Sequence, residues 1–268
     1  MPELPEVETI RRQLEAAAVG KTINRVEISE PKMFIGDSEA VAGQKIVGVG
    51  RVAKVLRILL ENGRALFIHF KLNGQLFLEM PGESLDRRFT RVVLFLDDGS
   101  RLIFNDTRKF AWMKVVKEPA KELPKAIEPF LENFTLENFI AVLSKTRRPI
   151  KLVLMDQEKI AGIGNIYANE SLFSARIDPF RPANSLKPSE IKRLYQAIPK
   201  ILQKAIDCKG SSGKDEWYRQ LNGQTGCYQE HFLVYQRNGQ KCPGTCAGEV
   251  VRKKQSGRST FYCPECQK

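Results

Sequence analysis

The sequence predicts an α+β protein in two parts, the first built from one helix and a set of β-strands and the second mostly helical. Three observations indicate this. Apolar residues recur at helical spacing over residues 5–18, short apolar runs separated by turn residues occupy residues 21–116, and helical periodicity returns after residue 130. The chain has 268 residues, which is enough for two domains.

The first element is an amphipathic helix over residues 5–18. Val7, Ile10 and Leu14 share one helical face, and Pro5 suits a first turn. Gly20 marks its end, because glycine commonly follows the last helical residue.

The next elements are β-strands. Asp97-Asp98-Gly99-Ser100 between two of the apolar runs is typical of a hairpin turn, so a β-sandwich or a barrel is expected. The predicted strand regions are Lys45–Leu60, Arg64–Phe70, Gln75–Glu79, Arg91–Leu96 and Arg101–Phe104.

A stretch rich in proline and lysine, residues 117–130, fits neither periodicity and is interpreted as a linker. The helices predicted after it cover the stripe Leu136–Leu143, residues 148–156, a segment that begins at Gly162–Asn165, and Ser189–Cys208. Residues 210–230 are polar and glycine-rich, which predicts a loop.

The chain is strongly basic. It carries 43 Lys and Arg against 31 Asp and Glu, a formal charge of +12. Such an excess indicates nucleic acid, an anionic membrane surface or a solvated basic face. No apolar run reaches the roughly 18 residues of a membrane span, and the start, MPELPEVETI, is unlike a secretory signal, so we expect a cytoplasmic protein.

Four of the six cysteines lie near the end of the chain, in the order Cys242-x3-Cys246 and Cys263-x2-Cys266. This spacing is typical of two knuckles that hold one structural zinc ion, with disulfides or plain thiols as the alternative. Between the knuckles lie Arg252, Lys253, Lys254 and Arg258, which suit a phosphate backbone.

The turn Gly162-Ile163-Gly164-Asn165 opens a predicted helix and would present backbone N–H groups to an anion. Glycine turns also serve packing alone. Four nearby cations favour phosphate contact, although a solvated face would look the same: Lys145, Arg147, Arg148 and Lys151.

The N-terminus offers a nucleophile if Met1 is removed, because Pro2 would then carry a secondary amine. An α-amino group titrates near about 7.7–8.0, so part of it is nucleophilic at neutral pH. Attack on a sugar aldehyde carbon would give an iminium ion, an electron sink for elimination, and Glu3 would protonate the departing oxygen or base. Alternatively, Pro2 is only a stiff terminal residue, and Glu3 favours the helix start.

Four blocks together resemble the bacterial formamidopyrimidine-DNA glycosylase family, and the resemblance covers essentially the whole chain. They are Met1-Pro2-Glu3-Leu4-Pro5-Glu6-Val7-Glu8-Thr9, Asp106-Thr107-Arg108-Lys109-Phe110, Ala161-Gly162-Ile163-Gly164-Asn165-Ile166-Tyr167-Ala168-Asn169-Glu170 and Arg258-x-Thr260-Phe261-Tyr262-Cys263-Pro264-x-Cys266-Gln267.

The resemblance implies a base-excision repair enzyme that removes oxidised purines from double-stranded DNA and then cuts the strand by β- and δ-elimination. It implies a catalytic β-sandwich domain over 2–116, the linker 117–130, a helix-two-turns-helix domain over 131–225 and a zinc-finger β-hairpin over 234–268. A monomer is expected.

By resemblance, Pro2 is the Schiff-base nucleophile and Glu3 the proton donor, while Lys54 and Arg258 assist elimination and contact phosphate. Arg108 reads the orphaned base, and Phe110 wedges the stack. The remaining expected DNA contacts are Leu72, Phe89, Arg147, Lys151 and Asn165, and the zinc ligands are Cys242, Cys246, Cys263 and Cys266.

Some positions depart from the family pattern. Leu72 stands where the family inserts a methionine, and Phe89 replaces a DNA-contacting histidine. Gly213 occupies an aliphatic position in the loop that closes over the flipped base, and the first zinc knuckle has one extra residue.

Two alternatives remain. An endonuclease VIII-like enzyme for oxidised pyrimidines shares Pro2, Glu3 and the zinc finger, although the Arg108–Phe110 wedge argues against it. A non-catalytic, zinc-stabilised DNA-binding protein would keep Met1.

Overall fold

The computed structural model describes residues 1–83, 88–122, 124–213 and 217–268. The predicted linker 117–130 and the predicted loop 210–230 each include residues outside this described part. Contacts group the chain into two units. The first unit comprises Met1–Leu123 with Ile206–Gln229, and the second comprises Pro124–Ala205 with Glu230–Lys268.

Helix α1, Leu4–Ala18, confirms the helix predicted at the N-terminus. Its first turn is closed by a capping box, in which the Glu3 carboxylate accepts from the Glu6 backbone and the Glu6 carboxylate accepts from the Glu3 N–H. Val7, Ile10 and Leu14 are buried on one face, as the sequence periodicity requires. Gly20 follows the helix with a φ of 90°.

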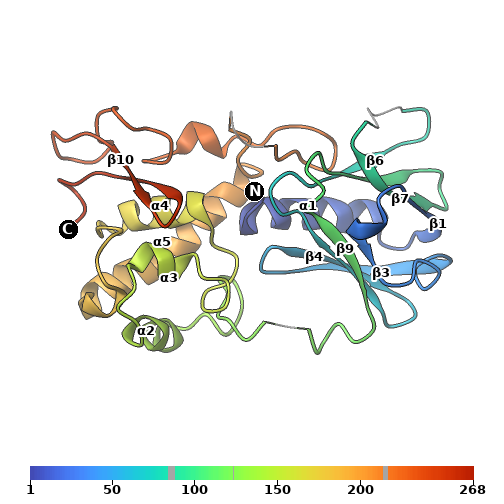
Figure 1. Ribbon diagram of the computed structural model, residues 1–268, viewed down its shortest axis with the longest axis horizontal. Helices are drawn as coiled ribbons and strands as arrows, with labels where there is room; N and C mark the ends of the chain where they lie inside the picture. Colours follow the sequence, from blue (N-terminus) through green and yellow to red (C-terminus); the bar gives the residue numbers. More distant parts are fainter. Residues whose placement is uncertain (84–87, 123, 214–216) are drawn as a thin grey trace. The chain divides into compact units, whose positions relative to one another are not determined.

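Within its described residues, the first unit has nine strands, which hydrogen-bond in the order β2-β9-β5-β4-β3-β1-β7-β8-β6 and form the two layers of a β-sandwich, joined where β1 pairs with β3 (Figure 1). The prediction of a sandwich is confirmed. The strands are β1 Thr22–Ile28, β2 Phe34–Ile35, β3 Gln44–Val52, β4 Val55–Leu60, β5 Ala65–His69, β6 Gln75–Glu79, β7 Thr90–Leu96, β8 Arg101–Asn105 and β9 Trp112–Val116.

The apolar run Lys45–Leu60 is two antiparallel strands and not one. Val52 pairs with Val55, so Ala53 and Lys54 form the turn. Ala53 has a φ of 52°, a conformation that glycine normally supplies, which is why the sequence carried no turn signal here. The hairpin predicted at Asp97–Ser100 does join β7 to β8.

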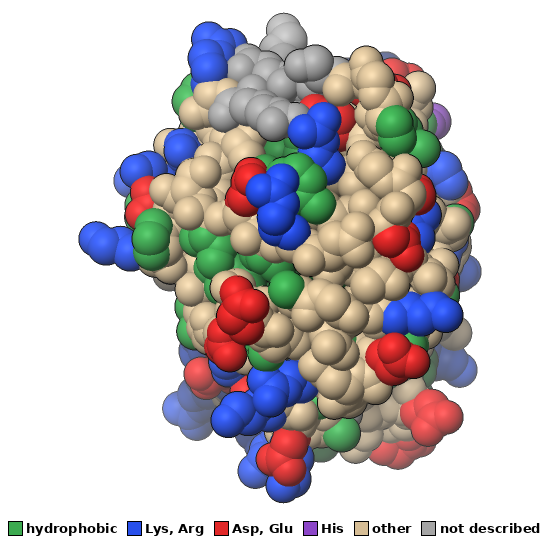
Figure 2. Space-filling model, turned by 90° about the vertical axis from the view of Figure 1, so that its right-hand side faces the viewer, with side chains coloured by type: hydrophobic (Ala, Val, Ile, Leu, Met, Phe, Trp, Pro, Cys, Tyr) green, Lys and Arg blue, Asp and Glu red, His purple; other side chains and the backbone are tan. Residues whose placement is uncertain are grey.

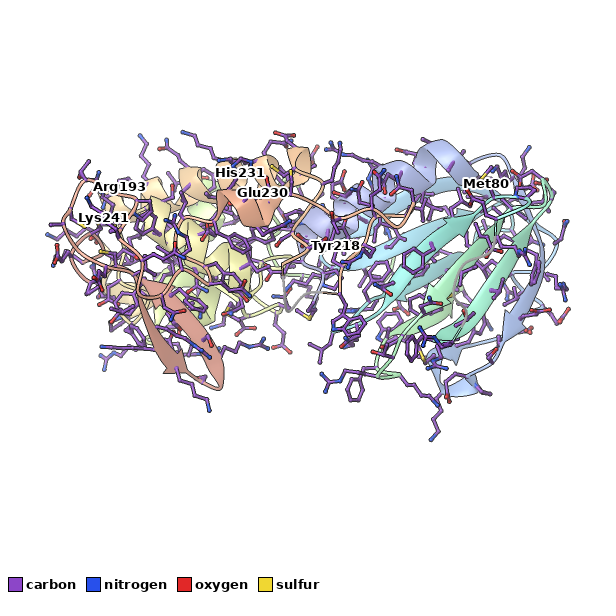
Figure 3. The ribbon with its side chains drawn as sticks, turned by 90° about the horizontal axis from the view of Figure 1, so that it is seen from above. Met80, Arg193, Tyr218, Glu230, His231 and Lys241 are labelled. Carbon is purple, nitrogen blue, oxygen red and sulfur yellow. The ribbon has the colours of Figure 1, made fainter. Side chains whose placement is uncertain are left out.

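The core of the first unit lies between α1 and the strands. Leu14 packs in the same buried cluster as side chains of β3, β4, β5, β7 and β8. Tyr218 and Leu221, which are distant in sequence, belong to that cluster too. Tyr218 lies beside α1 in Figure 3. The segment that follows the last long helix is therefore part of the first unit.

The second unit is helical with one small β-hairpin. Its longest helix carries Pro199 in its interior. The elements are α2 Leu136–Ser144, α3 Ile150–Leu154, α4 Asn165–Ser174, α5 Pro188–Asp207, the 3-10 turns η2 Ala183–Ser185 and η3 Tyr228–His231, and the strands β10 Val251–Gln255 and β11 Arg258–Tyr262. Helix α5 begins in this unit, and its last residues are grouped with the first. Among the described residues, no helix is long and apolar enough to cross a membrane.

Basic and acidic side chains are intermixed on the face of the first unit that Figure 2 shows. The excess of positive charge is not gathered on that face.

Candidate active site and nucleic-acid contacts

The N-terminus is held against the first unit. Pro2 is buried, and Glu3 is only 2% exposed at the N-cap of α1. The Glu6 carboxylate accepts a hydrogen bond from the Glu3 N–H at 2.8 Å and another from the Ser211 N–H at 2.9 Å. One buried side chain thus fixes the backbone next to Pro2 and ties it to the chain after α5.

Lys54 lies in the β3–β4 turn and is 5% exposed. The Arg51 side chain links this turn to α1, because its guanidinium donates to the Glu8 carboxylate at 3.1 Å and to the Ala53 carbonyl at 2.9 Å. Burial would raise the pKa of Glu8, but hydrogen bonds from Arg11 and Arg12 lower it overall. This anionic anchor keeps the Lys54 turn against the helix that begins at Glu3.

Asp106 shapes the loop that carries Arg108 and Phe110. Its buried carboxylate accepts from the backbone N–H groups of Arg108, Phe110 and Ala111, each at 2.8 Å. Phe110 is thereby left 55% exposed, with the Arg108 guanidinium 5.1 Å from the centre of its ring. The sequence reading missed this role of Asp106, although an aspartate at the end of a strand is a known turn signal.

The loop that carries Leu72 packs beside the Asp106 loop. A Cβ on Gly74 would lie 2.6 Å from the Phe70 carbonyl and 2.8 Å from the Ala111 Cβ, so only glycine permits this approach. Leu72 itself is 42% exposed. The two loops, with their exposed Leu72 and Phe110, therefore lie side by side.

Phe89 lies at the same end of the sandwich. Its carbonyl accepts from the Asp106 N–H at 3.0 Å, and the next residue, Thr90, pairs with Asn105 at the end of β8. The Phe89 side chain is 40% exposed. Three expected DNA contacts thus share one edge of the first unit with Arg108.

His69 ends β5 and bridges this group to the Lys54 turn, since its neighbour across the sheet is Val55. Its Nδ1 accepts from the Lys71 N–H at 2.9 Å, and its ring lies 5.6 Å from that of Trp112. Burial, together with the charges of Lys71 and Lys54, lowers the pKa of His69 to about 4. The ring is therefore neutral at physiological pH, and positive charge dominates its surroundings.

In the second unit, the glycine turn precedes α4 as predicted, with Gly164 at the N-cap and Asn165 as the first helical residue. The side chain of Gln157 holds this turn. Its amide oxygen accepts from the Gly162 N–H at 3.0 Å, and its amide nitrogen donates to the Ile163 carbonyl at 2.7 Å. The Asn165 Oδ1 is buried without a hydrogen-bond partner in the described part of the chain.

Arg147 and Lys151 differ in environment. Arg147 is exposed, whereas Lys151 is fully buried, with its ammonium donating to the Ser259 carbonyl at 2.9 Å and to the Thr260 hydroxyl at 2.8 Å. We had expected Lys151 to contact phosphate. In the structure its ammonium is directed to the hairpin instead, because α3 packs that side chain inward.

The β10–β11 hairpin presents Arg258. Gln255 pairs with Arg258 across a two-residue turn in which both Ser256 and Gly257 have positive φ, 46° and 78°. Arg258 is exposed at the start of β11. Lys151 supports the same hairpin from below through the two residues that follow Arg258. The turn chemistry and the buried lysine together position this cation.

The four C-terminal cysteines form one cluster, as predicted. Their sulfur atoms all lie within 4.8 Å of one another, with Cys242 and Cys266 at 3.6 Å, Cys246 and Cys263 at 3.6 Å, and Cys246 and Cys266 closer, at 3.0 Å. Thiolates about 2.3 Å from a tetrahedral zinc would be about 3.8 Å apart. The cluster therefore fits a closed zinc site, and the extra residue of the first knuckle is accommodated.

Glu170 lies in the middle of α4 and is buried. The sequence alone predicted no role for it. Its carboxylate accepts from the N–H groups of Leu233, Val234 and Tyr235 at 2.8, 3.0 and 2.9 Å. Burial raises the pKa of Glu170, partly offset by these three bonds and by Arg237. This carboxylate attaches the segment before the cysteine cluster to α4.

Comparison with known proteins decides the family. The model of the formamidopyrimidine-DNA glycosylase N-terminal domain matches residues 1–113, and that of the formamidopyrimidine-DNA glycosylase H2TH domain matches residues 126–216. The formamidopyrimidine-DNA glycosylase of Pelotomaculum thermopropionicum is 42% identical over 278 residues, which cover 100% of this chain and 99% of the relative. The chain belongs to the formamidopyrimidine-DNA glycosylase family.

Solved structures of this family agree with the fold. The crystal structure of the Thermus thermophilus family member superposes with a TM-score of 0.90 at 38% identity, covering 99% of this chain and 98% of that one. The Lactococcus lactis family member in complex with DNA that contains an abasic site gives a TM-score of 0.90 at 32% identity, with both chains covered completely. The β-sandwich, the helical region and the cysteine hairpin are thus those of the family.

Proposed function

We propose that this protein excises oxidised purines, such as 8-oxoguanine and formamidopyrimidines, from double-stranded DNA and then cleaves the strand at the abasic site. Its family membership establishes a DNA glycosylase of base-excision repair, and the lyase activity is part of this proposal. The observation that carries the lesion class is the loop built on Asp106, which leaves Phe110 and Arg108 exposed beside Leu72.

The reaction begins at Pro2 once Met1 is removed. Its secondary amine attacks C1′ of the damaged nucleotide, the bond from C1′ to the base breaks, and the base leaves with a proton that Glu3 supplies. The sugar ring then opens: the C1′–O4′ bond breaks, O4′ takes the proton that the Pro2 nitrogen gives up, and the electron pair of that nitrogen forms the iminium ion. Loss of a C2′ proton to the conjugated iminium expels the 3′-phosphate, and a further proton loss from the opened sugar expels the 5′-phosphate. Lys54 and Arg258 assist these two eliminations and contact phosphate.

The exposed side chains at the end of the sandwich fill the space that the everted nucleotide leaves. Removing a base from the stack costs a few kcal/mol, and an apolar wedge offsets that cost. Phe110 and Leu72 supply apolar surface, while the planar Arg108 donates hydrogen bonds to the orphaned base. Phe89 extends this surface.

The second unit supplies backbone and phosphate contacts. Arg147, the Asn165 turn and Arg258 contact the DNA backbone, while Lys151 acts by holding the hairpin that presents Arg258. Cys242, Cys246, Cys263 and Cys266 would hold one zinc ion, which would fix the hairpin in a structural role. The protein acts as a monomer.

Borohydride trapping tests the proposal. We expect a covalent adduct with duplexes that carry 8-oxoguanine, a formamidopyrimidine or an abasic site, and its loss in Pro2→Gly. Intact mass of the same sample reports whether Met1 has been removed. Failure to trap any of these duplexes after Met1 removal would contradict a Pro2 Schiff base, and faster trapping on oxidised pyrimidines would favour an endonuclease VIII-like enzyme.

A further inference from the structure

Cys208 and Cys227 lie outside the zinc cluster and face each other at the two ends of the segment that follows α5. Both are partly exposed, and their sulfur atoms lie within 4.8 Å of one another. The Cys227 N–H donates to the Cys208 carbonyl at 2.9 Å, and the Cys227 thiol is 3.4 Å from the same oxygen. Both residues belong to the first unit.

Residues 208–212 and 226–228 are held together by backbone contacts, and we call these two segments the neck. The Tyr228 N–H donates to the Gly210 carbonyl at 3.0 Å, and the Gly226 N–H donates to the Ser212 hydroxyl at 3.0 Å. A Cβ on Gly226 would lie 2.2 Å from the Gly210 carbonyl, so two chain segments touch here through their backbones. The backbones of Cys208 and Cys227 are hydrogen-bonded to each other and their sulfur atoms are within 4.8 Å, so we expect side-chain rotation to bring the sulfur atoms to the roughly 2.05 Å of a disulfide.

We propose that Cys208 and Cys227 form a reversible disulfide in the zinc-loaded protein, and that this bond makes the neck a redox-sensitive control of the active site. The oxidant is a low-molecular-weight disulfide such as oxidised glutathione. One cysteine thiolate attacks it and expels one glutathione thiolate, and the other cysteine then attacks the mixed disulfide and expels the second. The protein loses two hydrogens, and the oxidant gains two.

The neck is connected to the N-terminus by Glu6. The same carboxylate accepts from the Ser211 N–H, inside the neck, and from the Glu3 N–H, next to Pro2. A bond between the flanking cysteines restrains the Ser211 backbone and, through Glu6, the backbone of Glu3. This consequence for catalysis rests on the function proposed above, whereas formation of the disulfide does not.

The four zinc-binding cysteines are expected to stay unmodified under the same conditions, because coordinated sulfur atoms are withdrawn from exchange. Selective oxidation is therefore the distinguishing property of Cys208 and Cys227. A disulfide that appears only after zinc release would belong to a protein with a disrupted hairpin.

Peptide mapping under non-reducing conditions tests the site. The zinc-loaded full chain is equilibrated in glutathione buffers of increasing potential, quenched with N-ethylmaleimide and digested, while native mass spectrometry reports zinc. We expect a single cross-link between Cys208 and Cys227 with zinc retained, and separate glutathione adducts in Cys208→Ser and Cys227→Ser. Separate adducts in the unaltered chain, or cross-linking only after zinc loss, would overturn the proposal.

Two readouts then test the control of the active site. Amide exchange at Ser211 and Ser212 should slow at least threefold on oxidation. The single-turnover excision rate should differ at least twofold between oxidised and reduced protein, but not in the Cys208→Ser/Cys227→Ser double variant. Equal excision rates or unchanged amide exchange would overturn redox control. Peptide mapping does not depend on enzyme activity, so failure of the proposed disulfide can be told apart from failure of the proposed glycosylase function.

Discussion

Two buried carboxylates of the first unit, Glu6 and Asp106, hold backbone segments in place by accepting several N–H groups each, a role that their sequence positions did not predict. Glu6 serves two backbone segments at once, and Asp106 accepts from three backbone N–H groups of one short loop. Neither carboxylate is placed to contact a ligand directly in the function proposed here. Each fixes the backbone that presents a residue with chemistry, Pro2 in one case and Phe110 in the other.

Replacing Asp106 by asparagine should loosen the wedge. An amide has one accepting oxygen, so at least one of the N–H groups of Arg108, Phe110 and Ala111 would face an NH2 group. We expect a loss of about 1–3 kcal/mol in the free energy of unfolding, measured by urea denaturation. Excision of 8-oxoguanine should slow in parallel.

Asp37 offers the control for that variant, because its carboxylate caps an exposed turn by accepting from the Glu39 N–H at 3.0 Å. Asp37→Asn should change stability by less than about 0.5 kcal/mol. An Asp106→Asn protein as stable as Asp37→Asn would show that the loop does not depend on the carboxylate.

His69 should make stability depend on pH. Its pKa is about 4 in the folded protein against 6.5 when unperturbed, so the unfolded chain binds more protons between these values. Stability is therefore present above about pH 6.5 and is lost as the pH falls toward 4, by up to about 3 kcal/mol at 1.4 kcal/mol per pKa unit.

The variant His69→Asn keeps an accepting group for the Lys71 N–H but does not titrate. The difference in unfolding free energy between the unaltered protein and this variant should shrink from pH 7 to pH 4. Parallel pH profiles for the unaltered protein and His69→Asn would contradict a depressed pKa.

At the scale of elements, turns and short supports decide where the functional side chains lie. Much of the element pattern could be predicted from the sequence, including α1, the hairpin at Asp97–Ser100 and the helix after Gly164. The β3–β4 turn could not be, because Ala53 adopts a positive φ that its residue type does not announce. Burial of Lys151 was also unpredictable, because a lysine close in sequence to three other cations is expected to lie on a solvent-exposed face.

Glu170→Gln should detach the segment over 233–235 from α4. The carboxylate accepts three backbone N–H groups, and an amide cannot replace both oxygens. We expect a loss of about 2–3 kcal/mol in the free energy of unfolding, seen as a lower melting temperature, and faster amide exchange at Leu233, Val234 and Tyr235. The exposed Glu158 provides the control, and equal melting temperatures for Glu170→Gln and Glu158→Gln would contradict this anchoring role.

At the scale of the whole molecule, the net charge of +12 becomes meaningful only with a polyanionic partner. The face in Figure 2 mixes both signs, so this face shows no concentration of the positive charge. Among the cations proposed to contact DNA, Arg258 is exposed on a hairpin whose next residue, Ser259, is held by a hydrogen bond from Lys151.

The salt dependence of DNA binding tests that role. In Arg258→Ala, the slope of log affinity against log salt should become shallower by about 0.9, as expected for one lost phosphate contact. Arg25→Ala removes the same charge from an exposed position on β1, where Arg25 pairs with Glu27 and lies over the Phe95 ring and to which we assign no DNA contact, and its slope should not change. Identical slopes for both variants would mean that Arg258 adds only general charge.

The sequence by itself determined most strand and helix regions and the cysteine cluster, because periodicity and spacing are local properties, and its resemblance to the family supplied the expected roles of the site residues, which stay predictions. Only the tertiary structure decided that Asp106 shapes the wedge loop, that Lys151 faces the hairpin, and that Cys208 lies against Cys227. These relations join residues through burial and backbone contacts across turns, and no local pattern records which buried donor meets which acceptor.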